Sequence, residues 1–295
     1  MASSKAPEDK EQKKEAEKPV VNGVKKDEEE ELSEEDQNLK NELELLVQRL
    51  KENDHNLYPA ALESLKTLIR TSTSSMTAVP KPLKFLRPHY PDLQKRYEEW
   101  PHSQVKESFA DVLSVLGMTY SDDETLDSLK YRLLSPTPDP SAWGHEYVRH
   151  LASEIGIAYN KRLVDDPDKD TSDLLQLAKQ IIPFLLSHNA EPDAVDLLSE
   201  LGEISLLPEY VDENSWERVV GYVVACVPLL TQDDDRDFLL CARAIYKKYG
   251  KLVEAMTLSI RLDNMEFIEE DFAEAKDEYL PHIARAKGVE PWNDN

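Results

Sequence analysis

Apolar and charged positions follow a helical period in the first patterned segment of the chain. Its apolar stripe consists of Leu39, Leu43, Leu46 and Leu50. This i, i+4, i+7, i+11 spacing places the leucines on one face of a helix and the charges on the other. Ser33, with Asp36 three residues later, resembles a capping box, so the helix is predicted to begin there.

The same period predicts further helices along most of the chain. They are expected at residues 59–69, 103–117, 121–133, 143–159, 172–186, 191–201, 216–230, 237–249 and 252–262. Residues 216–230 are rich in valine and could form a strand, but no partner strand is evident, so a helix is favoured. Four prolines between residues 72 and 93 exclude a long helix, so an irregular stretch is predicted there.

Together these segments predict an all-α protein built as an irregular α-solenoid of antiparallel helical hairpins. The last two predicted helices flank Gly250 and would form one such hairpin. Its small residues Ala242, Ala244 and Ala255 would let the two helices approach closely. Stacked hairpins make a solenoid, and the lack of a strict repeat period makes this one irregular.

A charged tail is predicted to precede the solenoid. Residues 1–32 carry many charges and almost no large apolar side chains, so they cannot bury enough surface to offset the entropy of ordering. We therefore predict a disordered acidic tail, with an acidic interaction arm as the functional alternative. Residues 33–265 are predicted to form the helical domain, and residues 266–295 a divergent helical extension.

The chain is strongly acidic, with 59 Asp and Glu residues against 35 Lys and Arg and a formal net charge of −24. This charge repels nucleic acid and anionic lipid, so no nucleic-acid or membrane partner is expected. The longest apolar run, residues 219–230, is too short to span a bilayer, and no signal peptide is visible. Cys226 and Cys241 lie in apolar stretches, which indicates a reducing compartment.

One short stretch stands out against this acidity because it combines cations with aromatic rings. Its residues are Lys81, Lys84, Phe85, Arg87, His89 and Tyr90. Arg87 could pair bidentately with a partner's carboxylate and the rings could supply a buried anchor, so the stretch is a candidate protein-docking site. Alternatively, the same side chains brace the acidic body internally, and the sequence leaves both interpretations open.

Patterns typical of catalysis and metal binding fail on spacing. In HEYVRH the two histidines, His145 and His150, are five residues apart, whereas one helix face needs four. The acidic loop DPDKDTSD has Thr171 and Leu177 where a calcium loop needs Gly and Glu. The two cysteines show no CxxC arrangement, and no nucleotide-binding or nucleophile motif is found. The sequence therefore predicts no catalytic residue, no metal site and no cofactor.

Several long strings in the chain are distinctive. In order they are LSEEDQNLKNELELLVQRLKE, STSSMTAVPKPLKFLRPHYPDL, SFADVLSVLGMTYS, YRLLS, WGHEYVRHLASEIG, DAVDLLSELGEISLLPEYVDEN and VACVPLL. They resemble successive blocks of one family, the large non-ATPase subunit of the proteasome regulatory-particle base, which carries proteasome/cyclosome repeats. The blocks cover roughly residues 32–265 and correspond to the N-terminal region of that family.

The resemblance implies a non-catalytic scaffold and enzyme regulator in the 26S proteasome, cytoplasmic and nuclear, that contacts the base ATPases and other regulatory-particle subunits. It also implies that ubiquitin receptors dock through a toroid of repeats absent from this chain, so no receptor-binding residue is assigned. After Met265 the sequence is expected to leave the family pattern. The alternative is a free-standing truncated adaptor that kept the fold without joining the particle.

Overall fold

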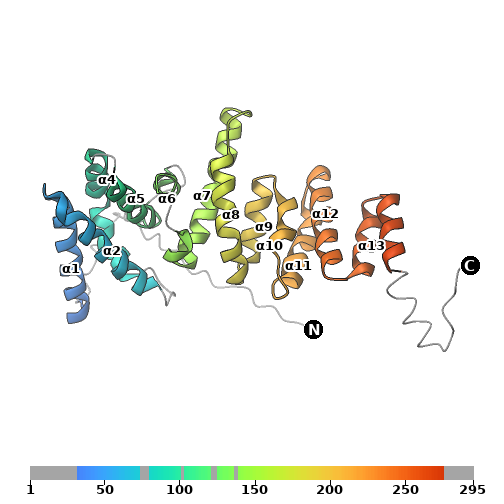
Figure 1. Cartoon of the computed structure of the whole chain (residues 1–295), viewed down its shortest axis with the longest axis horizontal. Coiled ribbons are helices and arrows are strands. Elements are labelled where there is room, and N and C mark those ends of the chain that lie inside the picture. Colours follow the sequence, from blue (N-terminus) through green and yellow to red (C-terminus); the bar gives the residue numbers. More distant parts are fainter. Residues whose placement is uncertain (1–31, 74–79, 101–102, 121–124, 136–138, 276–295) are drawn as a thin grey trace, which may run out of the picture.

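The computed structural model describes residues 32–73, 80–100, 103–120, 125–135 and 139–275. Within these ranges every regular element is a helix, so the all-α prediction is confirmed. Figure 1 shows the helices following one another in a long row, from α1 (Glu34–Lys51) at one end to α13 (Leu252–Arg261) at the other. Neighbouring helices pack side by side along this row, which is the predicted irregular solenoid.

The helices between these two ends are short to medium in length. The first group comprises α2 Tyr58–Thr73, α3 Lys81–Leu86, α4 Tyr90–Glu99, α5 Gln104–Gly117, α6 Asp127–Leu133 and α7 His145–Asp165. The second group comprises α8 Ser172–Ser187, α9 Glu191–Glu200, α10 Leu207–Tyr210, α11 Trp216–Cys226 and α12 Gln232–Lys248. After α13, residues 265–275 form a further helix. Short 3-10 turns join several of them, at His55–Leu57, Arg87–His89, Pro140–Trp143, Ile204–Leu206 and Val227–Leu229.

Side-chain caps fix two helix starts that the sequence predicts. Ser33 Oγ accepts a hydrogen bond from the Asp36 amide at 3.2 Å at the start of α1. Ser103 Oγ accepts one from the Lys106 amide at 3.3 Å before α5. Each cap satisfies an amide that has no partner within the helix. The predicted helix start at residues 121–124 lies outside the described residues.

The proline-rich stretch is helical where it is described, so the prediction of an irregular segment is wrong for residues 81–93. Pro82 lies in the first turn of α3, and Pro91 lies in the first turn of α4. A first-turn proline removes no intrahelical hydrogen bond and its φ already suits a helix. The prolines therefore divide this stretch into short helices rather than abolishing helical structure.

The C-terminal helices confirm one prediction and correct another. Residues 216–226 form α11, a helix and not a strand, as expected. In the hairpin of α12 and α13, Ala242 and Ala255 are fully buried. Gly250, in the turn that joins the two helices, has a φ of 66°. Ala244, by contrast, is exposed, so the prediction that it lies between the helices is wrong.

One continuous cluster of buried apolar side chains runs along the solenoid from Leu43 to Leu262. Gly156 of α7 leaves room for the Glu200 carboxylate of α9, because a Cβ at Gly156 would lie 1.6 Å from Glu200 Oε2. Among the described helices, none has the length and apolar character needed to cross a lipid bilayer. The predicted tail lies outside the described residues apart from Leu32.

Candidate docking surface and two buried polar clusters

The predicted docking stretch is carried by α3, the following 3-10 turn and the start of α4, which pack against α1 and α2. Lys51 Nζ at the end of α1 pairs with Asp92 at 2.6 Å. Arg96 donates hydrogen bonds to the carbonyls of Leu50 and Glu52 at 3.2 and 2.7 Å. These contacts fix the stretch on packed helices rather than on a free loop.

The aromatic members of the stretch turn inward. Tyr90 is fully buried, and its hydroxyl donates to Asp127 Oδ2 at 2.9 Å, where Gln94 Nε2 also donates at 3.1 Å. Burial and the Asp127 charge raise the pKa of Tyr90 far above its usual value. Phe85 is half-buried against the core. These two rings therefore brace the body of the protein.

The cationic members remain at the surface. Lys81 Nζ pairs with Asp36 Oδ1 at 2.7 Å, and this hydrogen bond lowers the pKa of Asp36. Lys84 and Arg87 are exposed and form no ion pair with any residue that the structure describes, and His89 is half-buried. The docking prediction is thus narrowed to Lys84 and Arg87, and whether they bind a partner stays a prediction.

The two histidines of HEYVRH have separate partners. His145 Nδ1 lies 3.7 Å from Glu146 Oε1, whereas His150 Nε2 lies 2.9 Å from Glu154 Oε1. Glu154 is buried and also accepts a hydrogen bond from the Leu129 amide at 2.6 Å. His150 therefore belongs to a contact between α6 and α7, and the described residues contain no grouping of three or more side chains suited to a metal ion.

The carboxylates of the acidic loop organise the backbone around the start of α8. Asp166 Oδ1 accepts from the Asp168 amide at 3.2 Å. Asp170 Oδ1 accepts from the Ser172 amide at 2.9 Å, and these bonds to Ser172 lower the pKa of Asp170. In this way the loop joins α7 to α8 through local side-chain contacts.

The two cysteines are free thiols in different surroundings. Cys226 is half-buried at the end of α11, and Cys241 is buried in α12. Burial raises the pKa of Cys241 to about 12, so its thiol stays protonated at neutral pH. Its place in the apolar core gives Cys241 the role of a small packing residue.

A first buried polar cluster joins α2, α5, α6 and the 3-10 turn before α7. We call it the Asp111 cluster; it comprises Lys66, Arg70, Asp111, Arg132 and Trp143. Asp111 Oδ1 accepts from Trp143 Nε1 at 2.8 Å and from Arg132 at 3.1 Å. Asp111 Oδ2 lies 3.3 Å from Lys66 Nζ and 3.9 Å from Arg70. The Arg70 guanidinium also lies over the Trp143 ring at 4.6 Å.

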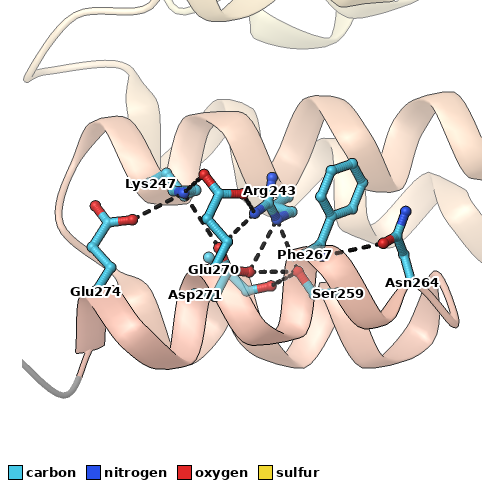
Figure 2. A network of polar contacts seen from close by, with 9 residues as sticks. Arg243, Lys247, Ser259, Asn264, Phe267, Glu270, Asp271 and Glu274 are labelled. Carbon is cyan, nitrogen blue, oxygen red and sulfur yellow. Dashed lines mark hydrogen bonds and ion pairs between the residues drawn. The ribbon is translucent and has the colours of Figure 1, made fainter.

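A second cluster holds helical residues 265–275 against α12 and α13, and Figure 2 shows it from close by. We call it the Asp271 cluster; it comprises Arg243, Lys247, Ser259, Glu270 and Asp271. Asp271 is fully buried and accepts from Arg243 through both oxygens, at 2.6 and 3.0 Å. Glu270 pairs with Arg243 and Lys247, each at 2.8 Å. The Phe267 ring covers the Arg243 guanidinium at 4.2 Å.

Neither cluster follows from the sequence prediction, although one signal points to the first. Asp111 lies between apolar residues of α5, and a charged residue at a core position needs a buried partner. The partner itself could not be identified, because Arg132 is one of many charged residues on neighbouring helices. Asp271 lies in a segment rich in acidic residues and gives no such signal.

Comparison with known protein families matches residues 43–283 to the family described as RPN1 N-terminal domain. This chain belongs to the RPN1 N-terminal domain family. The family predicted from the sequence blocks is therefore confirmed. The matched residues extend past Met265 and include the Asp271 cluster, while the predicted domain boundaries themselves stay predictions.

Curated relatives of this chain include proteasome subunits. The 26S proteasome regulatory subunit rpn-1 of Neurospora crassa is 58% identical over 264 residues, covering 88% of this chain and 29% of that protein. The subunit rpn1 of Schizosaccharomyces pombe is 53% identical over 251 residues, covering 85% and 28%. The 26S proteasome non-ATPase regulatory subunit 2 of Dictyostelium discoideum is 45% identical over 244 residues, covering 83% and 27%. The chain thus spans less than a third of the length of these relatives.

Proposed function

We propose that this chain is a non-catalytic scaffold of the 26S proteasome regulatory-particle base, supporting ubiquitin-dependent protein degradation as an enzyme regulator. The observation that carries this proposal is the family match over residues 43–283, together with relatives named as 26S proteasome regulatory subunits. A helical solenoid supports a binding role, because stacked helices present a long surface to partners.

The proposed partners are the base ATPases and other subunits of the regulatory particle, in the cytoplasm and nucleus. The proposal assigns no catalytic residue, cofactor or nucleic acid to the chain. Its charge of −24 favours partner surfaces that are basic overall. Lys84 and Arg87 are exposed cations in this acidic body and are proposed to contact a carboxylate-rich partner segment.

Affinity purification tests the proteasome role. A tagged copy of the full chain is recovered from lysate of its own cells under gentle, nucleotide-containing conditions. We expect the base ATPases to co-purify, as measured by mass spectrometry against an unrelated acidic helical protein with the same tag. Recovery without any base ATPase would contradict the proposal.

Sedimentation of native lysate separates this function from that of a free-standing adaptor. A scaffold of the particle is expected to sediment with the proteasome ATPases. An adaptor that kept the fold without joining the particle would instead migrate entirely with small proteins. Quantitative blotting of the gradient fractions decides between the two.

Charge reversal tests the narrowed docking surface. The double substitution Lys84→Glu and Arg87→Glu reverses both charges of the proposed docking surface. It is expected to reduce the amount of base ATPases recovered by roughly tenfold. The matched control reverses Lys161 and Lys179, which are exposed on α7 and α8. Equal recovery of both double variants, at unchanged helicity by circular dichroism, would remove the docking assignment from Lys84 and Arg87.

A further inference from the structure

The exposed cations of the candidate docking surface lie in one line. Lys81, Lys84 and Arg87 follow one another at intervals of three residues along α3 and into the 3-10 turn after it. Residues three apart are neighbours on a helix surface, so these side chains lie on one side of the segment, and all three are exposed. Lys81 is paired with Asp36, whereas Lys84 and Arg87 form no ion pair with any residue that the structure describes. Two cations of the line therefore remain available.

The ion pair of Lys81 places the first turn of α1 beside the first turn of α3. Lys81 Nζ lies 2.7 and 2.8 Å from the two carboxylate oxygens of Asp36. Asp36 in turn donates its amide to the capping hydroxyl of Ser33, one helical turn earlier. Leu32, the first described residue, therefore lies about one turn from the carboxylate that holds the first cation of the line.

The sequence directly before Leu32 carries the complementary charge. Residues 27–31 read DEEEE, which is the longest uninterrupted run of carboxylates in the chain, and we call them the acidic run. Five residues span at most about 17 Å when extended. Arg87 follows Lys81 by six residues, which corresponds to about 9 Å along a helix. The acidic run is therefore long enough to reach both Lys84 and Arg87.

We propose that the acidic run lies along Lys84 and Arg87 of the same molecule, so that a carboxylate-rich partner must displace it. Single ion pairs at a surface are weak, but the covalent connection supplies the run at an effective concentration in the millimolar range. The same weakness lets a partner with more contacts replace it. The contact belongs to the purified chain, and only its control of partner access rests on the function proposed above.

Two-dimensional NMR of the purified full chain tests the contact. The run variant combines the substitutions Asp27→Asn, Glu28→Gln, Glu29→Gln, Glu30→Gln and Glu31→Gln. The matched control neutralises five carboxylates earlier in the sequence, with the substitutions Glu8→Gln, Asp9→Asn, Glu11→Gln, Glu15→Gln and Glu17→Gln. The amide signals of residues 83–87 should shift in the run variant and keep their wild-type positions in the control. The difference between wild type and run variant should disappear at about 0.5 M salt, because salt screens exposed charge pairs.

Titration with a peptide of five glutamates, blocked at both ends, measures how far the acidic run occupies the cations. If the run covers them in about two-thirds of the molecules, the peptide should bind the run variant roughly threefold more tightly than the control. The two variants have the same net charge, so a general repulsion of the peptide affects both equally. Adding Lys84→Met and Arg87→Met to each variant should remove the difference.

Recovery of the base ATPases from lysate separates this proposal from the docking function. Roughly threefold more base ATPase should be recovered with the run variant than with its control. Normal NMR signals in the run variant, together with reduced recovery for Lys84→Glu and Arg87→Glu, would leave the docking function without the acidic run. Shifted NMR signals, with equal recovery for every variant, would support the contact and remove its role in docking.

Three results would overturn the proposed contact. The first is an absence of shifts at residues 83–87 in the run variant, or equal shifts in the control. The second is an equal affinity of the glutamate peptide for the run variant and the control. The third is a dependence of the wild-type signals on protein concentration, because the acidic run of a second copy would then occupy Lys84 and Arg87.

Discussion

Asp111 and Asp271 are both fully buried, yet their surroundings differ. Both oxygens of Asp271 accept hydrogen bonds, from Arg243 and from Ser259. Asp111 uses only Oδ1 in this way, while its Oδ2 lies near Lys66 and has no hydrogen bond among the described residues. The Asp271 carboxylate is saturated, whereas the Asp111 carboxylate keeps free capacity.

The two clusters also differ in what they connect. The Asp271 cluster joins one helix, residues 265–275, to a hairpin and therefore acts as a clasp at one end of the solenoid (Figure 2). The Asp111 cluster lies where three helices and a 3-10 turn meet. The Asp271 cluster thus holds a single helix, while the Asp111 cluster joins several elements within the solenoid.

The largest effect is expected from removing the junction carboxylate. Asp111→Ala leaves the buried cations Lys66 and Arg132 without their counter-charge, and breaking a buried ion pair in this way costs about 3–5 kcal/mol. Because the junction lies inside the solenoid, the whole unfolding transition should shift. Chemical denaturation followed by circular dichroism measures this shift.

Asp111→Asn is the matched control. It keeps an acceptor for Trp143 and Arg132 but removes the negative charge, so it should lose less stability than Asp111→Ala. If the two variants were equally stable and within about 1 kcal/mol of the wild type, the junction would not depend on its carboxylate.

A local effect is expected from breaking the clasp. Arg243→Met leaves Asp271 buried with only Lys247, at 3.4 Å, and Ser259 nearby, which should cost about 3 kcal/mol. Residues 265–275 lie at one end of the described solenoid, so this helix should open without the rest of the chain. Hydrogen exchange should therefore speed up in this helix by roughly a hundredfold while α1 to α9 keep their protection.

Arg236→Met provides the control for the clasp, since Arg236 is exposed on the same helix and lies outside the cluster. It should leave the exchange of residues 265–275 unchanged. A uniform loss of protection along the whole chain in Arg243→Met would show that the two ends are not independent units.

A smaller effect with a defined sign concerns pH. Burial alone would raise the pKa of Asp271, but hydrogen bonds from Arg243 and Ser259 and the Arg243 charge hold it below its usual value. A lowered folded-state pKa adds stability above the unfolded pKa of about 4, and this stability is lost as pH falls further. The hydrogen-exchange protection of residues 265–275 should therefore decrease as the pH is lowered below about 4.

The variant Asp271→Asn tests this assignment because it cannot titrate. In this variant, residues 265–275 should be less protected from hydrogen exchange than in the wild type at pH 7. This difference in protection should become smaller as the pH is lowered toward 3. A gap that stayed constant over this range would mean that Asp271 is not the titrating group.

The helices could be predicted because their signals are local. The leucine stripe of α1 and the caps Ser33 and Ser103 depend only on residues within a few positions of one another. The proline-rich stretch was missed because Pro82 and Pro91 occupy first turns, where the rule against proline does not apply. Element type was thus accessible from the sequence, whereas this local exception was not.

The candidate site could be predicted only in part, because its contacts are distant in sequence. Tyr90 lies 37 positions from its partner Asp127, and Arg243 lies 28 positions from Asp271. A helical period states which residues share a face but not which face of another helix they meet. Composition could therefore single out Lys84 and Arg87, while the inward orientation of Tyr90 required the packed structure.

The smallest expected effect is the difference in stability between two serine-to-alanine variants, one at Ser259 and one at Ser135. Ser259 Oγ accepts from Arg243 at 2.8 Å and contacts Asp271 at 2.5 Å, so Ser259→Ala removes made bonds from a buried charge and should cost about 1–2 kcal/mol. Ser135 Oγ has no such partner among the described residues, so Ser135→Ala should change stability by no more than about 0.5 kcal/mol. Denaturation midpoints of the two single variants give this difference directly. An equal loss in both would mean that Ser135 Oγ already makes a hydrogen bond.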